Sequence, residues 1–229
     1  MNSMTTTTCL VSAIFVVLLS AGCSPGQPDS PARAAAPVFE NAAFYKDGKF
    51  DVEKGKDAVI ALMKHHGYPV YPGMREALWV SDYGTGQFTR LGLAARMWKN
   101  NEADRYMLMD LFLLPGQMLP EHWHLPEGDN PAKREGWLVR YGSSHIVGEG
   151  EPNLALEVVV PQCHNGGEVT VKHEVFAKAG EFAMLNREGA HHWQLGGPEG
   201  AIVNEVANVH SDKGVRHLDP AINKHFLGN

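Results

Sequence analysis

GQMLPEHWHLPEGDNPAKREGWLVRYG, residues Gly116–Gly142, is the stretch that decides the fold and the chemistry this chain can support. His122 and His124 are separated by one residue, Glu135 follows after an insert, and all three are good ligands for a divalent metal. Alternate side chains of a strand share a face, so the two histidines point the same way in extended backbone. The insert LPEGDNPAK has the turn-forming composition of a loop between antiparallel strands. One metal ion could therefore be held from two neighbouring strands.

The spacing of these residues resembles a known motif. Glycine, His-x-His, glutamate and glycine follow one another as in the first cupin motif, with a longer gap before the glutamate. The second cupin motif resembles the run Gly180, Asn186, Gly189 and His192, in which Asn186 stands at the usual proline position. This resemblance implies a mainly β fold, a single cupin jelly-roll barrel.

A closer resemblance is to the D-lyxose ketol-isomerase family. It is carried by PGQMLPEHWH, KREGWLVRYG, EGEPN, HHWQLGGPEGAIVNEVAN and HLDPAI, and runs from about Asp57 to about Ile222. It implies a metal-dependent aldose–ketose isomerase of the D-lyxose/D-xylulose type, with D-mannose/D-fructose as a further substrate pair. A cis-enediol intermediate and a homodimer are the accompanying expectations.

The expected metal ligands are His122, His124, Glu135 and His192. Three nitrogens and one carboxylate without a thiolate suit manganese, which we expect first, or iron, cobalt, nickel or zinc. His191 is the rival for the fourth position, because neighbours in a strand point to opposite faces. The spacing from Gly189 favours His192.

Two further residues are candidates for proton transfer. Glu205 is the one carboxylate in the apolar run AIVNEVAN, and the family resemblance implies a glutamate there that acts as the base. Lys133 lies two residues before Glu135, so on a strand it would face the same cavity and could stabilise the negative charge of an enediolate. The alternatives are a strand glutamate and a loop lysine that both face solvent.

Two residues are candidates for sugar contact. Gln194 shares the strand parity of His192, and Asp219 opens the Asp-Pro pair that resembles the family's closing motif. Asp219 could instead cap the barrel. The remaining histidines show no spacing that predicts a site, and we expect them to be ordinary polar residues: His145, His164, His173, His210, His217 and His225.

The amino terminus has the features of a targeting segment. LVSAIFVVLL is uncharged and too short to span a bilayer, which is typical of a signal peptide. LSAGC, ending at Cys23, resembles a bacterial lipobox, so we expect a signal peptide at 1–22, a lipidated Cys23 and a Pro-, Ser- and Ala-rich linker at 23–42. The protein would then be anchored to a bacterial membrane by lipid, outside the cytoplasm. A plain secretory signal or a misassigned start is the alternative, because no Lys or Arg precedes the apolar run.

The rest of the chain, 43–229, is expected to form one cupin domain with a helix at its start. DVEKGKDAVIALMKHHG, ending at Gly67, has helical apolar spacing, and His65 and His66 suit its carboxyl end. Short apolar runs between turn residues predict strands at Leu78–Asp82, Tyr106–Leu114, Trp137–Val147, Leu154–Val160, Val169–Val175, Glu181–Leu185 and Ala201–Ala207.

Composition excludes one class of partner. The net charge of -6 and the lack of a Lys/Arg cluster argue against nucleic-acid binding. Two other functions stay open beside the isomerase. An iron cupin dioxygenase could use the same ligands, and a sugar-binding lipoprotein could have kept the barrel and lost turnover.

Overall fold

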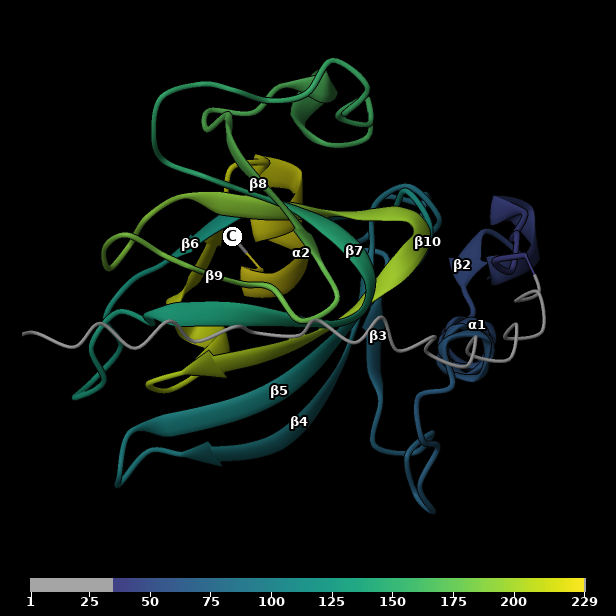
Figure 1. Ribbon diagram of the computed structural model, residues 1–229, viewed down its shortest axis with the longest axis horizontal. Helices are drawn as coiled ribbons and strands as arrows, with labels where there is room; N and C mark the ends of the chain where they lie inside the picture. The colour runs from purple at the N-terminus through teal and green to yellow at the C-terminus, as the bar shows by residue number, and fades with distance from the viewer. Residues whose placement is uncertain (1–34, 229) are drawn as a thin grey trace, which may run out of the picture. The chain divides into compact units, whose positions relative to one another are not determined.

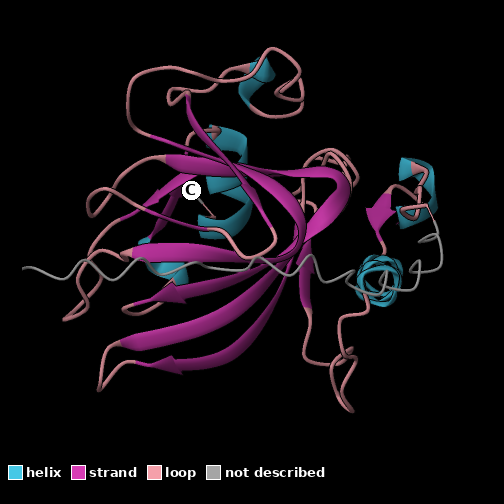
Figure 2. Cartoon of the chain, viewed as in Figure 1, coloured by secondary structure: helices cyan, strands magenta, loops and turns pink. Residues whose placement is uncertain are grey.

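A computed structural model describes residues 35–228, and within them nine strands are hydrogen-bonded into one antiparallel sheet (Figures 1 and 2). The predicted signal peptide and Cys23 lie outside the described residues, as does most of the predicted linker. The described elements in chain order are η1 Asn41–Phe44, β1 Tyr45–Lys46, β2 Lys49–Phe50, α1 Val52–His66, β3 Trp79–Ser81, β4 Leu93–Asn101, β5 Tyr106–Leu113, β6 Met118–His124, β7 Glu135–Gly148, η2 Asn165–Gly167, β8 His173–Lys178, β9 Phe182–Met184, β10 His192–Ala207, η3 Asp212–Gly214, β11 Val215–His217 and α2 Pro220–Leu227.

Strand β10 organises the sheet. It pairs with β5, β6 and β7, and the sheet continues from β5 to β4 and β3, from β6 to β11, and from β7 to β8 and β9. The register shifts between Gly196 and Ala201, where the strand bends. At this bend Gly142 has a φ of 70°, and a Cβ on it would lie 2.0 Å from the carbonyl oxygen of Gly200. Only glycine fits at position 142. The close approach of the two backbones there lets β7 and β10 bend at the same level, which closes the sheet around its interior.

The alternation of side chains divides the core in two. Leu111 and Leu113 of β5 point into the barrel interior with Trp137 and Trp193, whereas Phe112 points outward. The outward cluster is covered by α1, through buried residues that include Leu62. The predicted mainly β architecture with a helix at its start is therefore present.

Helix α1 begins and ends where the sequence predicts. The Asp51 side chain accepts hydrogen bonds from the backbone N–H groups of Glu53 and Lys54, and Gly67 closes the helix with a φ of 69°. None of the helices within residues 35–228 is long and apolar enough to cross a membrane.

One predicted strand is wrong. Residues 154–160 form a loop, because Leu154 N–H bonds to Lys172 O and Val158 N–H turns back to Ala155 O instead of joining a ladder. Leu154, Ala155, Val158 and Val160 still pack against the barrel, whereas Leu156 and Val159 are exposed. The predicted strand at 169–175 is shifted to β8, and β4, β11 and α2 were not predicted.

Candidate metal centre and the cavity beside it

Four buried side chains converge inside the barrel. His122 and His124 come from β6, Glu135 from the first position of β7 and His192 from the first position of β10. One ligand atom from each lies within 4.8 Å of all the others. Glu135 Oε1 is 2.9 Å from His124 Nε2 and 3.1 Å from His192 Nε2. The four predicted ligands therefore meet at one point.

The neighbouring His191 lies on the other face. Its ring stacks on Trp123 at 4.1 Å between centroids, with 8° between the planes. Its Nδ1 is 2.9 Å from Glu121 Oε1. Strand parity thus separates His192 from His191, as expected for adjacent residues in extended backbone.

The tautomers of two of these histidines suit metal binding. His122 Nδ1 lies 2.9 Å from Pro120 O, and His192 Nδ1 lies 3.0 Å from Ala190 O. A carbonyl oxygen only accepts, so each Nδ1 carries the hydrogen and each Nε2 keeps its lone pair. His192 Nε2 is buried and makes no hydrogen bond within the described part of the chain.

Two more ligand atoms of the cluster are buried in the same way as His192 Nε2. His124 Nε2 and Glu135 Oε1 are buried and, apart from their approach to each other and to His192, have no hydrogen-bond partner among residues 35–228. Buried polar atoms normally find a partner, so convergent lone pairs with none are a strong indication of a cation. The donor set fits a divalent metal with nitrogen and oxygen preference.

Burial also sets the charges of the cluster. It lowers the pKa of His124 to about 4 and that of His122 well below its usual value, so both rings are neutral near pH 7. Burial disfavours the charged form of Glu135, but the neighbouring Lys133 ammonium and two histidines hold the pKa of that carboxyl well below its usual range. Neutral imidazoles and an ionised carboxylate are the forms that bind metal.

Lys133 joins the cluster to a second carboxylate. It lies in the loop two residues before β7 and is buried, with Nζ donating to Glu135 Oε2 at 2.7 Å and also to Glu205 Oε1. Trp137 Nε1 donates to Glu205 Oε2 at 3.2 Å. Burial raises the pKa of Glu205 to about 7, against the opposing effect of Lys133. Lys133 and Glu205 are both buried, so the alternatives of a loop lysine and a strand glutamate that face solvent are excluded.

A cavity of about 320 Å³ opens beside these groups. His122, His124, Lys133 and Glu205 line one part of it. Much of the remaining wall is apolar and comes from β3 and the turn after it, β4, β5, β6 and the carboxyl-terminal segment: Trp79, Tyr83, Leu93, Ala95, Met97, Met109, Leu111, Leu119, Phe226 and Leu227. A small molecule bound in this cavity would contact both the metal cluster and Glu205.

The two predicted sugar contacts are elsewhere. Gln194 is fully buried and outside the cavity lining, with its Oε1 accepting from Ser144 Oγ at 3.2 Å. It keeps the interior face, opposite Leu119 and Ile146, but lies in the packed core beside the cavity. Asp219 caps α2, accepting from Ala221 N–H and Asn165 N–H at 2.8 Å each, and does not line the cavity among the described residues. The capping alternative therefore describes Asp219.

The sequence did not predict several polar residues of the cavity. His217 was expected to be an ordinary polar residue, but it is paired with His122 across β11 and β6 and its side chain lines the cavity. Burial lowers its pKa to about 3. His210 also lines the cavity, as does Tyr83, where burial and the charge of Glu205 raise the pKa of the phenol. The spacing of the histidines does not reveal His217, because strand pairing brings it to His122; its one signal in the sequence is that it opens the HLDPAI run that carries the family resemblance.

The fold has counterparts among solved structures. L-Ribose isomerase from Cellulomonas parahominis, solved with L-psicose, matches with a TM-score of 0.55 at 15% identity, covering 76% of this chain and 94% of that one. L-Ribose isomerase from Acinetobacter sp. DL28, solved with L-ribose, matches with a TM-score of 0.53 at 15% identity and the same coverage. At this identity the match shows a shared fold.

The sequence has nearer relatives. No protein-family model matches the chain. D-Lyxose ketol-isomerase from Cohnella laeviribosi is 34% identical over 173 residues, which cover 75% of this chain and 92% of the relative. D-Lyxose/D-mannose isomerase from Thermosediminibacter oceani is 32% identical over 180 residues, 77% of this chain and 95% of the relative. With this extent of identity along nearly the whole length of those relatives, the chain belongs to the D-lyxose ketol-isomerase family.

Proposed function

We propose that the protein is a metal-dependent aldose–ketose isomerase that interconverts D-lyxose and D-xylulose, with D-mannose and D-fructose as a further pair. The observation that carries this is the position of Glu205 and Lys133 beside the four-residue metal cluster, in the wall of one cavity. Isomerisation needs a group that removes a proton from carbon next to a place where negative charge is stabilised. The cavity provides both.

Each residue of the cavity has a defined task in this reaction. Glu205 takes the proton from C2 of the open-chain aldose and returns it to C1, while the hydroxyl proton on O2 moves to O1. A pKa of about 7 allows the same carboxyl to accept and release a proton near neutrality. The Lys133 ammonium stabilises the enediolate charge and is held in place by the two carboxylates that it contacts.

The metal would be held by His122, His124, Glu135 and His192. When bound, it supplies a Lewis acid that polarises the carbonyl and hydroxyl oxygens on C1 and C2. Three nitrogens and one oxygen suit manganese, iron, cobalt, nickel or zinc, and we propose manganese as the ion to supply first.

We also propose that the mature chain is a lipoprotein anchored through Cys23 outside the cytoplasm. The support is the uncharged apolar run, the LSAGC sequence and the Pro-rich stretch that follows. A homodimer remains a prediction, to be tested by analytical ultracentrifugation.

The deciding experiment is an anaerobic aldose-to-ketose assay over pentoses and hexoses, with protein stripped by chelator and reloaded with manganese. We expect turnover of D-lyxose that depends on the metal and proceeds without oxygen. If no metal-reloaded form of the protein converts any of the sugars, the isomerase proposal is refuted. Consumption of oxygen by iron-loaded protein would favour a dioxygenase, and sugar binding without turnover would favour a binding lipoprotein.

A further inference from the structure

A row of aromatic rings leads from the metal cluster to the cavity mouth. His217 lies 5.7 Å from His122 between ring centroids, Tyr83 lies 5.4 Å from His217, and Phe226 lies 5.4 Å from Tyr83. Trp79 is 6.3 Å from both Tyr83 and Phe226. All four residues beyond His122 line the cavity, and we call them the aromatic wall.

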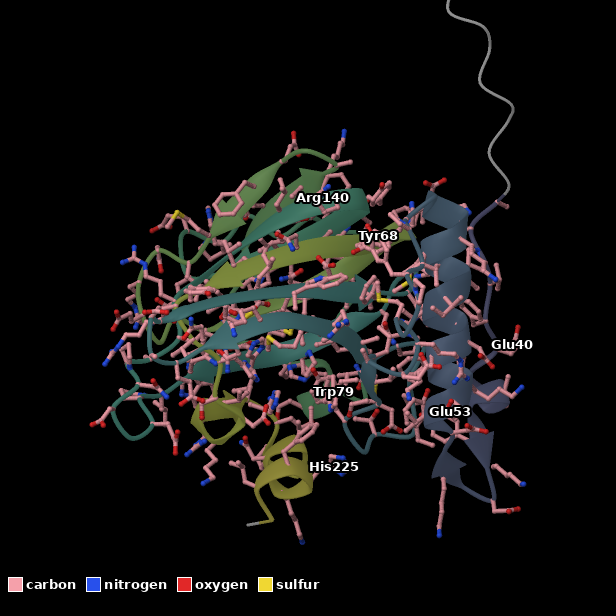
Figure 3. All side chains as sticks on the ribbon, turned by 90° about the horizontal axis from the view of Figure 1, so that it is seen from below. Glu40, Glu53, Tyr68, Trp79, Arg140 and His225 are labelled. Carbon is pink, nitrogen blue, oxygen red and sulfur yellow. The ribbon has the colours of Figure 1, made fainter. Side chains whose placement is uncertain are left out.

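The wall has a buried end and an open end. His217 and Tyr83 are 6% and 5% exposed, whereas Trp79 and Phe226 are 45% and 43% exposed. Figure 3 labels Trp79 and His225, and both lie on the side of the barrel where α2 packs. The wall therefore runs inward from solvent to the proposed metal.

The backbone at Tyr83 is held in an unfavourable conformation. Its φ is 56°, which is uncommon for a residue with a bulky side chain. The Asp82 carboxylate stabilises the turn by accepting from Gly84 N–H at 3.0 Å, from Gly86 N–H at 3.1 Å and from the Tyr45 hydroxyl at 2.8 Å. Such strain persists where surrounding contacts over-determine it, and it is concentrated at functional sites.

Two polar groups of the wall lack partners. His217 Nδ1 is buried and makes no hydrogen bond within residues 35–228. The Tyr83 hydroxyl makes none either within the described part of the chain, although its side chain lines the cavity. A buried atom such as His217 Nδ1 is costly to leave unpaired unless a ligand or water satisfies it, and the Tyr83 side chain reaches the same cavity. Both sit between the metal cluster and the mouth, where the far end of a chelated sugar would extend.

We propose that Tyr83 and His217 bind the hydroxyls of the sugar beyond C2, and that Trp79 and Phe226 at the mouth limit the length of sugar accepted. This inference rests on the proposed function for the orientation of the sugar, with C1 and C2 at the metal. Aromatic faces pack against the C–H faces of a carbohydrate, while the phenol and imidazole supply the few directed hydrogen bonds that give specificity. The wall thus selects the substrate without taking part in proton transfer.

The test measures binding of polyols, which cannot isomerise, to manganese-loaded protein by calorimetry. D-Arabinitol represents the five-carbon chain and D-mannitol the six-carbon chain. Tyr83→Phe keeps the ring and removes only the hydroxyl, and we expect it to weaken arabinitol binding about tenfold, in line with loss of a buried hydrogen bond. His217→Phe should do the same while keeping ring contacts. The matched control is Tyr71→Phe, an exposed tyrosine outside the cavity lining.

Chain length is tested at the mouth. Phe226→Ala should raise the ratio of hexose to pentose kcat/KM about tenfold, the usual effect of one or two methylenes of added space. Phe182→Ala, an exposed phenylalanine away from the cavity, is its control and should leave the ratio unchanged.

The outcomes separate the two proposals. If the parent isomerises sugars but Tyr83→Phe binds arabinitol as the parent does, the aromatic wall is not the sugar site and the isomerase proposal stands. If the parent isomerises no sugar but Tyr83→Phe still weakens arabinitol binding, the wall stands and the isomerase proposal is wrong. Tyr83→Phe decides the question if His217→Phe does not fold.

Discussion

Replacement of Glu205 by glutamine is the most informative single change. The carboxylate accepts from Lys133 on one oxygen and from Trp137 on the other, but glutamine has only one acceptor oxygen. One buried donor therefore loses its partner, which costs about 1–3 kcal/mol of folding free energy. Lys133 keeps its ion pair with Glu135, so no buried charge is left alone. The variant should stay folded and keep its metal.

The loss of activity should be far larger than the loss of stability suggests. A positioned general base contributes about 10²–10⁴ in rate, which corresponds to about 3–5 kcal/mol in the barrier. Glu205→Gln should reduce both isomerisation and exchange of the C2 hydrogen by at least about a hundredfold. Both are measured by NMR in deuterated water on metal-loaded protein.

Asp110→Asn is the matched control. Asp110 is also a buried carboxylate with several donors, Tyr68, Trp98 and Asn204, but it lies outside the cavity lining. We expect this change to lower stability and leave exchange intact. Parental exchange in Glu205→Gln would show that the glutamate is structural, and Lys133 would become the first candidate for the base.

The other predictions address the metal, the buried charge network, the carboxyl-terminal helix and the anchor. His124→Ala should deplete bound metal in elemental analysis, whereas His191→Ala should retain it; the reverse result would contradict the assignment of the cluster. Lys133→Met leaves two buried carboxylates without their cation, so urea unfolding of the metal-free protein should show a loss of about 3–5 kcal/mol, and an unchanged midpoint would refute the ion-pair argument. Asp219→Ala removes the cap of α2 and should cost about 1 kcal/mol in the same assay, with no effect if the cap is dispensable. Cys23→Ala should release the protein from membranes on fractionation, and membrane retention equal to the parent would exclude lipidation at this residue.

The sequence was informative where a short stretch sets the geometry. Strand parity brings His122 and His124 together and separates His192 from His191, because both effects depend only on neighbouring residues. Helix α1 was predictable for the same reason, since its cap and its closing glycine are local.

Features set by long-range pairing were not predictable. His217 reaches the cavity only because β11 pairs with β6, and no spacing in the sequence encodes that pairing. Gln194 has the predicted interior parity, but the packing of the core around it, including its hydrogen bond with Ser144, keeps it out of the cavity. Tyr83 gives no signal in the sequence, since its role follows from a turn built by Asp82.

The position of β10 has a consequence for how such an enzyme can change. His192 and Glu205 lie on this one strand, on either side of its bend, and each half is hydrogen-bonded to two neighbours: β6 and β7 before the bend, β5 and β7 after it. Their positions are therefore fixed by the most extensively paired strand of the sheet. The aromatic wall comes instead from short peripheral pieces, the β3 turn, β11 and α2. The two residues at the mouth, Trp79 and Phe226, are therefore the part of the cavity that can be substituted with the least effect on the position of His192 and Glu205.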